Sequence, residues 1–282
     1  MAARMQLPTP QLTARLFGAR CLPALTDEPL FEQVGVRIAF TARAGGVSEG
    51  PFCSLNLGSH VNDDADAVMR NRALLLEAFD AADMQLVVPT QVHGDVIVGV
   101  DDATQAVVDE ARDRAQAGAD AVTVSVTKVA ALLCFADCVP VIIVSPSGRF
   151  AVVHAGWRGV MNGIAPKAVR VLAEADAPIW GADAASSYNV YIGPHIHAEC
   201  FETGEEVHAA FVERFGATCA VDATHISLLA ALTHDLVAAG INPDRLVDAG
   251  ICTVCSSDEY FSFRAADGVC GRQGAFAFRK GV

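Results

Sequence analysis

Three short motifs place metal-binding side chains next to turn-forming residues. His93 lies in QVHGD (91–95), Cys138 in FADCVP (135–140) and His154 in HAGWRG (154–159). The glycines and the proline beside them are typical of strand ends, where a scaffold projects side chains into a cleft. Two imidazoles and a thiolate supply three zinc ligands and leave a fourth position for water or substrate, as catalytic zinc requires. The motifs therefore predict a metal site built at strand ends.

Each of these residues also has a purely structural interpretation. A histidine at a turn, such as His93, often does no more than make hydrogen bonds. A cysteine in an apolar strand, such as Cys138, usually packs as a small hydrophobic residue. For each residue taken singly the structural interpretation is the commoner one, so the metal-site prediction depends on the three motifs together.

The hydrophobic pattern predicts the elements that would position these motifs. Strands are expected at 36–43, 84–100 (a pair around the His93 turn), 119–126, 129–135, 139–145, 149–157, 188–194, 245–251, 259–264 and 274–280. Helices are expected at 64–83, 160–175, 202–215 and 225–240. Thr224 is the expected cap of the last helix, and the polar stretch 102–119 is expected to be exposed.

The chain shows no repeat and no linker rich in proline, glycine or serine. We therefore expect one α/β domain of the α+β type, with packed mixed β-sheets flanked by helices. Residues 1–34 are expected to form a loose N-terminal extension, and residues 35–282 the catalytic domain.

Composition limits the classes of function. Of the 282 residues, 52% are hydrophobic, and 20 Lys and Arg oppose 33 Asp and Glu, for a net charge of −13. This charge disfavours nucleic acid as a partner. The longest apolar run, 129–144, is too short for a bilayer and is interrupted by Asp137 and Pro140, so no membrane association is expected. An odd number of cysteines, nine, without an export signal predicts reduced thiols and a cytoplasmic protein.

Taken together, the motifs resemble those of one family. Further shared stretches are TARAGGVSEGPFCSLNLGSHVNDD (41–64), IGPHIHAECFE (192–202), CT (252–253), FSFR (261–264) and GRQGA (271–275). With QVHGD, FADCVPV and HAGWRG in this order, they are similar to the bacterial laccase-domain proteins. These proteins were once called multicopper polyphenol oxidoreductases and are now regarded as zinc-dependent purine nucleoside phosphorylases, with a peptidoglycan-editing role proposed for some members.

The resemblance implies a ligand set and a reaction. Zinc would be held by His93, Cys138 and His154, the residues also selected by their chemistry. Phosphate would attack the ribose C1′ of a purine nucleoside such as adenosine, inosine or methylthioadenosine, and activated water at the same centre would deaminate adenosine. The implied partners are a purine nucleoside and phosphate, and the sequence carries no signal for an oligomeric state.

Further polar residues are candidates for the same site. Arg43 and Arg158 are expected to bind phosphate, and Asp137 to orient a ligand or receive a proton, so all three are predicted catalytic residues. The predicted substrate-binding residues are Gln91, Asn56, Asn71 and Arg264. Relatives commonly have a second arginine after the FS motif, where this chain has Ala265.

Rival interpretations stay open. Cys252 and Cys255 have the spacing of a zinc or redox pair, but no second such pair accompanies them. A cysteine hydrolase would use Cys138 with His154 as its base on an amide or ester, such as a cell-wall precursor. Copper-dependent polyphenol oxidation would need a histidine-rich cluster, which the eight scattered histidines do not furnish, although copper can bind such a His-Cys-His set in vitro.

Overall fold

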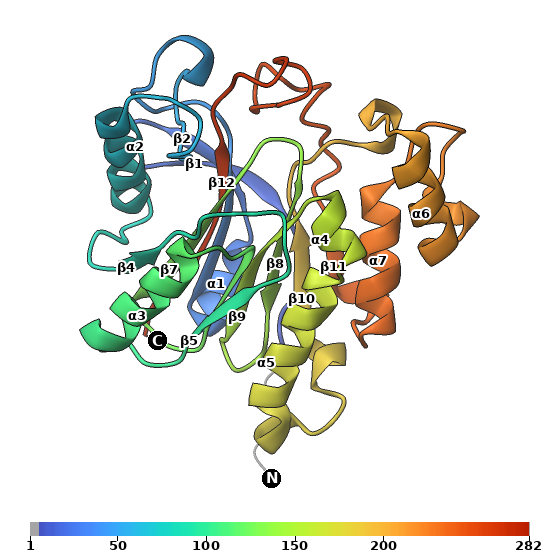
Figure 1. Ribbon diagram of the computed structural model, residues 1–282. Helices are drawn as coiled ribbons and strands as arrows, with labels where there is room; N and C mark the ends of the chain where they lie inside the picture. The colour runs from blue at the N-terminus through green and yellow to red at the C-terminus, as the bar shows by residue number, and fades with distance from the viewer. Residues whose placement is uncertain (1–5, 282) are drawn as a thin grey trace.

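The longest apolar runs form strands that are buried on both faces. Every residue of β7 (Val129–Phe135), β8 (Val139–Val144) and β9 (Phe150–Ala155) is buried. A strand can bury both faces only if a sheet or helix covers each of them. The computed structural model, which describes residues 6–281, satisfies this requirement with two six-stranded mixed sheets packed face to face (Figure 1).

Strand order places β7 in one sheet and β8 and β9 in the other. The first sheet runs β1-β2-β3-β12-β7-β4 and the second β11-β10-β8-β9-β6-β5. The remaining strands are β1 (Thr13–Phe17), β2 (Leu22–Thr26), β3 (Val36–Thr41), β4 (Gln85–Val87), β5 (Ile97–Val100), β6 (Ala121–Val124), β10 (Asn189–Ile192), β11 (Leu246–Asp248) and β12 (Gln273–Arg279). The turn between β7 and β8 and the connection between β4 and β5 therefore both cross from one sheet to the other.

Alternation along β7 divides its side chains between two cores. Leu133 and Phe135 pack between the sheets, where they meet side chains such as Phe150 of the second sheet. Leu132 and Cys134 point the other way, toward Leu75 of the helix α2. The two-residue period of a strand thus builds the inner core and an outer core at once.

The helices are α1 (Glu28–Val34), α2 (Ala65–Ala78), α3 (Gln105–Gln116), α4 (Trp157–Met161), α5 (Ile164–Trp180), α6 (Glu205–Phe215) and α7 (Leu228–Ala238). Helix α2 covers the outer face of the first sheet and α4 to α7 that of the second, whereas α1 and α3 pack against the core between the sheets. Buried residues of α5 recur at Ile164, Ala168 and Leu172, which is one helical face, and they pack on the second sheet. In Figure 1, α2 and α3 lie to one side of the strands and α4 to α7 to the other. The expected α/β fold with packed, helix-flanked sheets is confirmed.

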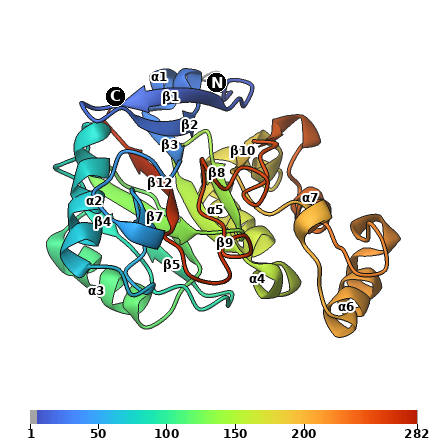
Figure 2. The same cartoon turned by 90° about the horizontal axis from the view of Figure 1, so that it is seen from above.

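The N-terminal segment differs from the sequence-based expectation of a loose extension. Instead, β1 pairs with β2 and β2 with β3 along one edge of the first sheet (Figure 2). Asp27 caps α1 and also accepts a buried hydrogen bond from Tyr191 of β10, at 2.8 Å. Residues 1–5 lie outside the described part of the chain.

Three local predictions are also corrected. Residues 259–264 form turns, because the side-chain amide of Gln273 satisfies both the N–H and the C=O of Phe261 in place of a partner strand. Ser227, rather than Thr224, caps α7 by accepting from the N–H of Ala230. The polar stretch 102–119 contains α3, which buries one stripe against the core between the sheets. None of the helices within residues 6–281 combines the length and the apolar character needed to cross a membrane.

Candidate functional site

The three motifs selected in the sequence meet at one end of the two sheets. His93 lies in the β4–β5 connection, Cys138 in the β7–β8 turn and His154 in the last part of β9. One donor atom from each lies within 4.8 Å of the other two, and Cys138 Sγ is 3.7 Å from His93 Nε2. The structure thus brings together the residues that were proposed as metal ligands.

Tight backbone geometry makes this approach possible. His93 and Asp137 have φ values of +59° and +84°, so both turns pass through a left-handed conformation. A Cβ on Gly156 would lie 2.8 Å from His93 Cδ2 and 3.1 Å from Cys138 Sγ. The glycine of HAGWRG is therefore required because the imidazole and the thiol pack directly against its backbone.

Asp120, which the sequence analysis missed, holds two of the three motifs in place. Its fully buried carboxylate accepts a hydrogen bond from His154 Nδ1 at 2.7 Å. The same carboxylate accepts from the N–H groups of Val92, His93 and Gly94 at 3.2, 3.0 and 2.7 Å. Because Nδ1 of His154 is engaged, its Nε2 is the nitrogen available to a metal. The sequence did contain a signal for this role, because Asp120 stands in GADAV (118–122), where an acidic residue directly precedes a buried strand.

The protein groups alone form a charged pair at the site. Desolvation opposes ionisation of Cys138, but the charge and hydrogen bond of His154, followed by those of His93, outweigh it and lower the thiol pKa to about 6. Desolvation likewise opposes protonation of His154, but Cys138 and Asp120 outweigh it and raise the imidazole pKa to about 9. A thiolate in this setting is a good ligand for a cation and also a good nucleophile.

A cavity of about 310 Å³ opens beside the three donor residues. It is also lined by three residues that were selected in the sequence, Gln91, Asp137 and Arg264. Cys134, four residues before Cys138, was also expected to line it and does. Sequence reasoning missed the remaining lining residues, which are His60, Ala136, Ile196, Phe201, Phe263 and Arg272. A larger hollow of about 560 Å³, beside Trp180 and Arg245, has no histidine or cysteine among its described lining residues.

Asp137 ties three segments of the cavity wall together. Its carboxylate accepts from Thr253 Oγ1 at 2.6 Å and from the N–H of Arg264 at 2.7 Å. Its carbonyl accepts from the N–H of Ile196 at 2.9 Å. Gln91 is held similarly, because its amide both donates to and accepts from the backbone of Cys134. Both residues line the cavity with side chains that the protein already holds in one orientation.

Two arginines without a salt-bridge partner among the described residues line the cavity. Arg264 donates to the carbonyls of Cys200 and Glu202, and Arg272 donates to those of Cys270 and Gly271. Within residues 6–281, neither guanidinium has a carboxylate partner at salt-bridge distance. The charge affects a neighbour, since desolvation followed by Arg272 lowers the pKa of His60. These arginines can therefore attract an anion.

Two predicted phosphate ligands lie outside the cavity lining. Arg43 donates to the carbonyls of Cys53 and Ser257, at 3.0 and 2.6 Å, and so ties the glycine-rich loop to the 256–261 segment. Arg158 is exposed on α4, with its guanidinium 4.3 Å from the centre of the Trp157 ring. The arginines that line the cavity are Arg264 and Arg272.

Asn56 and Asn71 are fully buried and also lie outside the lining. Asn56 accepts from the backbone N–H of Arg272 at 2.8 Å, so it positions a cavity arginine without facing the cavity. Asn71 accepts from Val47 N–H and donates to backbone carbonyls and to a serine hydroxyl of the glycine-rich loop. Both amides hold loops that surround the site.

Comparisons with known proteins show the family and the fold that this chain shares. Residues 37–280 match the family described as multi-copper polyphenol oxidoreductase laccase. A purine nucleoside phosphorylase of Xylella fastidiosa is 34% identical over 241 residues, which cover 82% of this chain and 87% of that protein. The adenosine deaminase RL5 of an unknown prokaryotic organism is 32% identical over 257 residues, covering 87% and 95%. The crystal structure of YlmD from Geobacillus stearothermophilus has a TM-score of 0.79 and 30% identity, covering 95% of this chain and 100% of that one.

Proposed function

The chain belongs to the family described as multi-copper polyphenol oxidoreductase laccase, and from this premise we propose that it is a zinc-dependent purine nucleoside phosphorylase. The observation that carries the proposal is one cavity that combines a three-donor cluster with two arginines lacking acidic partners. A cation site beside an anion site fits an enzyme that brings phosphate to a neutral nucleoside. Relatives named purine nucleoside phosphorylase support the same reaction class.

The donor set fits zinc. Two imidazoles and a thiolate are the ligand types that zinc accepts in catalytic sites, and donors within 4.8 Å of one another can reach one ion. Asp120 leaves His154 Nε2 as the nitrogen facing the cluster, as a metal-bound imidazole requires. His93, Cys138 and His154 would hold the ion, which when bound supplies a Lewis acid beside the cavity.

The cavity walls suit the two substrates. Phe201, Phe263 and Ile196 offer apolar and aromatic surface on which a purine base can stack. Arg264 and Arg272 present charge for phosphate, and a guanidinium can hold two phosphate oxygens at once. A volume of about 310 Å³ lies at the lower end of the range for small-molecule sites, which suits a nucleoside-sized ligand.

In the proposed reaction the residues of this chain bind and orient the reactants. A phosphate oxygen forms a bond to ribose C1′ while the bond from C1′ to the purine nitrogen breaks, and the purine leaves after gaining a proton. The products are the free base and ribose 1-phosphate. The arginines hold the nucleophile next to the sugar, where positive charge develops on the ring as the base departs.

Adenosine deamination is the second reaction supported by a specific observation. One relative that is 32% identical is named an adenosine deaminase. If the same cavity turns C6 of adenosine toward the metal donors, water replaces the amino group and ammonia leaves. Such a reaction uses no phosphate, so the dependence of product formation on phosphate separates the two activities.

A cysteine hydrolase is a rival from another class, and the low pKa of Cys138 favours it. In that case Cys138 would attack an amide or ester, and His154 would transfer the proton. The two proposals predict opposite reactivity of the Cys138 thiol. A thiolate bound to zinc resists alkylation, whereas a free nucleophilic thiolate is alkylated quickly.

The function is tested by substituting the proposed ligands. Cys138→Ala and His154→Ala should each remove the cavity zinc and nearly all phosphorolysis while the far-UV circular dichroism spectrum stays unchanged. Arg158→Gln, on the exposed face of α4, is the matched control and should keep both zinc and activity. Full phosphorolysis in a variant that has lost the cavity zinc would contradict the proposal. Fast alkylation of Cys138 in wild-type protein, together with cleavage of an amide or ester that is lost in Cys138→Ala, would establish the hydrolase instead.

A further inference from the structure

A second group of thiols lies behind the cavity wall, outside the proposed active site. Cys200 ends a 3₁₀ turn (Ala198–Cys200), and Cys252 and Cys255 come from the segment that follows β11. Sulfur atoms from these three residues and a carboxylate oxygen of Glu199 all lie within 4.8 Å of one another. The CxxC pair that was unaccompanied in sequence thus gains a third thiol from a distant segment.

The spacing of the sulfurs matches ligands of a shared ion better than it matches a disulfide. Cys200 Sγ is 3.6 Å from Cys255 Sγ. Two thiolates on a tetrahedral zinc, each about 2.3 Å from the ion, are about 3.8 Å apart. Sulfurs in a disulfide are only about 2.05 Å apart, and a bond between these two would leave the third thiol of the group without a partner.

A backbone N–H group orients the sulfur of Cys252. The N–H of His197 donates to Cys252 Sγ at 3.4 Å. This bond fixes the direction of the first sulfur of the CxxC pair, as an outer hydrogen bond fixes a metal ligand.

Three sulfurs this close together can all carry a negative charge only around a cation. Like charges at this distance repel strongly, and a divalent ion reverses the effect by neutralising them. Each thiol that is protonated before binding would release one proton when it becomes a ligand.

We infer that Cys200, Cys252 and Cys255, with Glu199 as the fourth ligand, form a second site that holds a thiophilic divalent cation such as Zn²⁺. Three sulfurs and one carboxylate complete a closed tetrahedral set, which is the form of a structural site. His197 lies beside the carboxylate, with its Nδ1 3.6 Å from Glu199 Oε1. No residue of this site belongs to the His93–Cys138–His154 cluster, so the inference does not depend on the proposed function.

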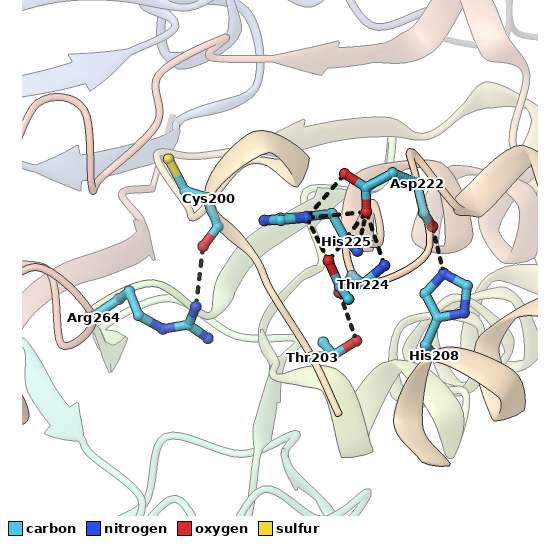
Figure 3. Close-up of polar contacts among 7 residues, drawn as sticks. All are labelled: Cys200, Thr203, His208, Asp222, Thr224, His225 and Arg264. Carbon is cyan, nitrogen blue, oxygen red and sulfur yellow. Dashed lines mark hydrogen bonds and ion pairs between the residues drawn. The ribbon is translucent and has the colours of Figure 1, made fainter. Parts of the chain in front are cut away.

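The ion would fix the wall of the active-site cavity. Arg264 donates to the carbonyl of Cys200, as Figure 3 shows, and Thr253, between the paired cysteines, donates to Asp137. The segment that holds Cys200 and the segment that holds Cys252 meet directly, since the backbones of His195 and Cys252 pair in an isolated β-bridge. A metal between them would hold both the arginine and the aspartate of the cavity in place.

Metal counting in the full-length protein tests the inference. Purified under reducing conditions, wild-type protein should contain about one equivalent of zinc more than Cys200→Ser or Cys255→Ser. Cys21→Ser, which removes an exposed thiol elsewhere, is the control and should keep the wild-type content. Cys138→Ala should retain the zinc that Cys255→Ser loses, so failure of the active-site proposal and failure of this one give different results.

Cadmium provides a second readout that does not depend on how the serine variants fold. Titration of metal-stripped Cys138→Ala protein with Cd²⁺ should produce sulfur-to-cadmium ultraviolet absorption that saturates at about one equivalent. Unchanged zinc content in both serine variants, or no cadmium absorption, would overturn the site. A disulfide between Cys200 and Cys255 would also overturn the site. It would appear in protein isolated metal-free under non-reducing conditions, as two thiols that resist alkylation.

Discussion

Asp120 provides a sharp test of how the metal donors are held. Its carboxylate accepts from His154 Nδ1 and from three backbone N–H groups around His93. In Asp120→Asn, one oxygen becomes an NH₂ group that faces N–H donors. If that group faces His154, the imidazole must accept through Nδ1 and carry its proton on Nε2, which removes Nε2 as a metal ligand.

The magnitude follows from the bonds that are lost. Each carboxylate oxygen accepts two of the four hydrogen bonds, so the substitution removes at least two charge-assisted bonds, each worth about 1.5–3 kcal/mol. We expect a loss of stability of about 3 kcal/mol or more. Substitution of a residue that orients a metal ligand typically weakens metal binding about 10-fold to 100-fold, and we expect a loss of zinc affinity in that range.

Three measurements check this prediction. Competition with a chelator gives the zinc affinity, urea unfolding gives the stability, and ¹⁵N chemical shifts of His154 report which ring nitrogen carries the proton. The control is Asp109→Asn, an exposed carboxylate on α3 that pairs only with nearby surface residues. Unchanged zinc affinity and an unchanged His154 tautomer in Asp120→Asn would refute the reasoning, even if stability falls.

The remaining predictions concern the phosphate side, the glycine and the base-stacking wall. Arg264→Gln should raise the KM for phosphate about 10-fold to 100-fold, the loss of one charge-assisted contact of about 1.5–3 kcal/mol, while Arg158→Gln leaves it unchanged; equal effects would remove the phosphate role. Gly156→Ala should lower zinc affinity, because its Cβ would lie 2.8 Å from His93 Cδ2. Wild-type zinc affinity in this variant would show that His93 moves aside without disturbing the metal site. Phe263→Ala should raise the KM for adenosine by about fivefold or more through lost stacking of about 1–3 kcal/mol, with the KM for phosphate unaffected.

The central strands and the metal donors could be predicted from sequence because their signals are local. Unbroken apolar runs identified β7, β8 and β9, and the unusual motifs at their ends identified Cys138 and His154. Strand order was not predictable, because β4 and β5 follow each other in the chain yet belong to different sheets. That crossing brings His93 to the other two donors.

Much of the cavity could not be predicted because it depends on long-range contacts. Arg272 faces the cavity through a bond to Asn56, which is more than 200 positions away in the sequence, and nothing near either residue indicates the pairing. Arg43 seemed suited to an anion because it opens a glycine-rich loop, but the carbonyls of that loop and of the 256–261 segment hold its side chain. Cys200 carried no signal at all until the fold placed it beside Cys255.

The central claim is zinc-dependent phosphorolysis at the His93–Cys138–His154 cluster. The most direct test follows adenosine and inorganic phosphate by ³¹P NMR, with zinc-loaded protein, metal-stripped protein and stripped protein to which zinc is returned. We expect ribose 1-phosphate to form in step with free adenine in the loaded and restored samples, and none to form in the stripped sample. Ribose 1-phosphate formed equally well after the metal is removed, or no ribose 1-phosphate from the zinc-loaded protein, would contradict this claim.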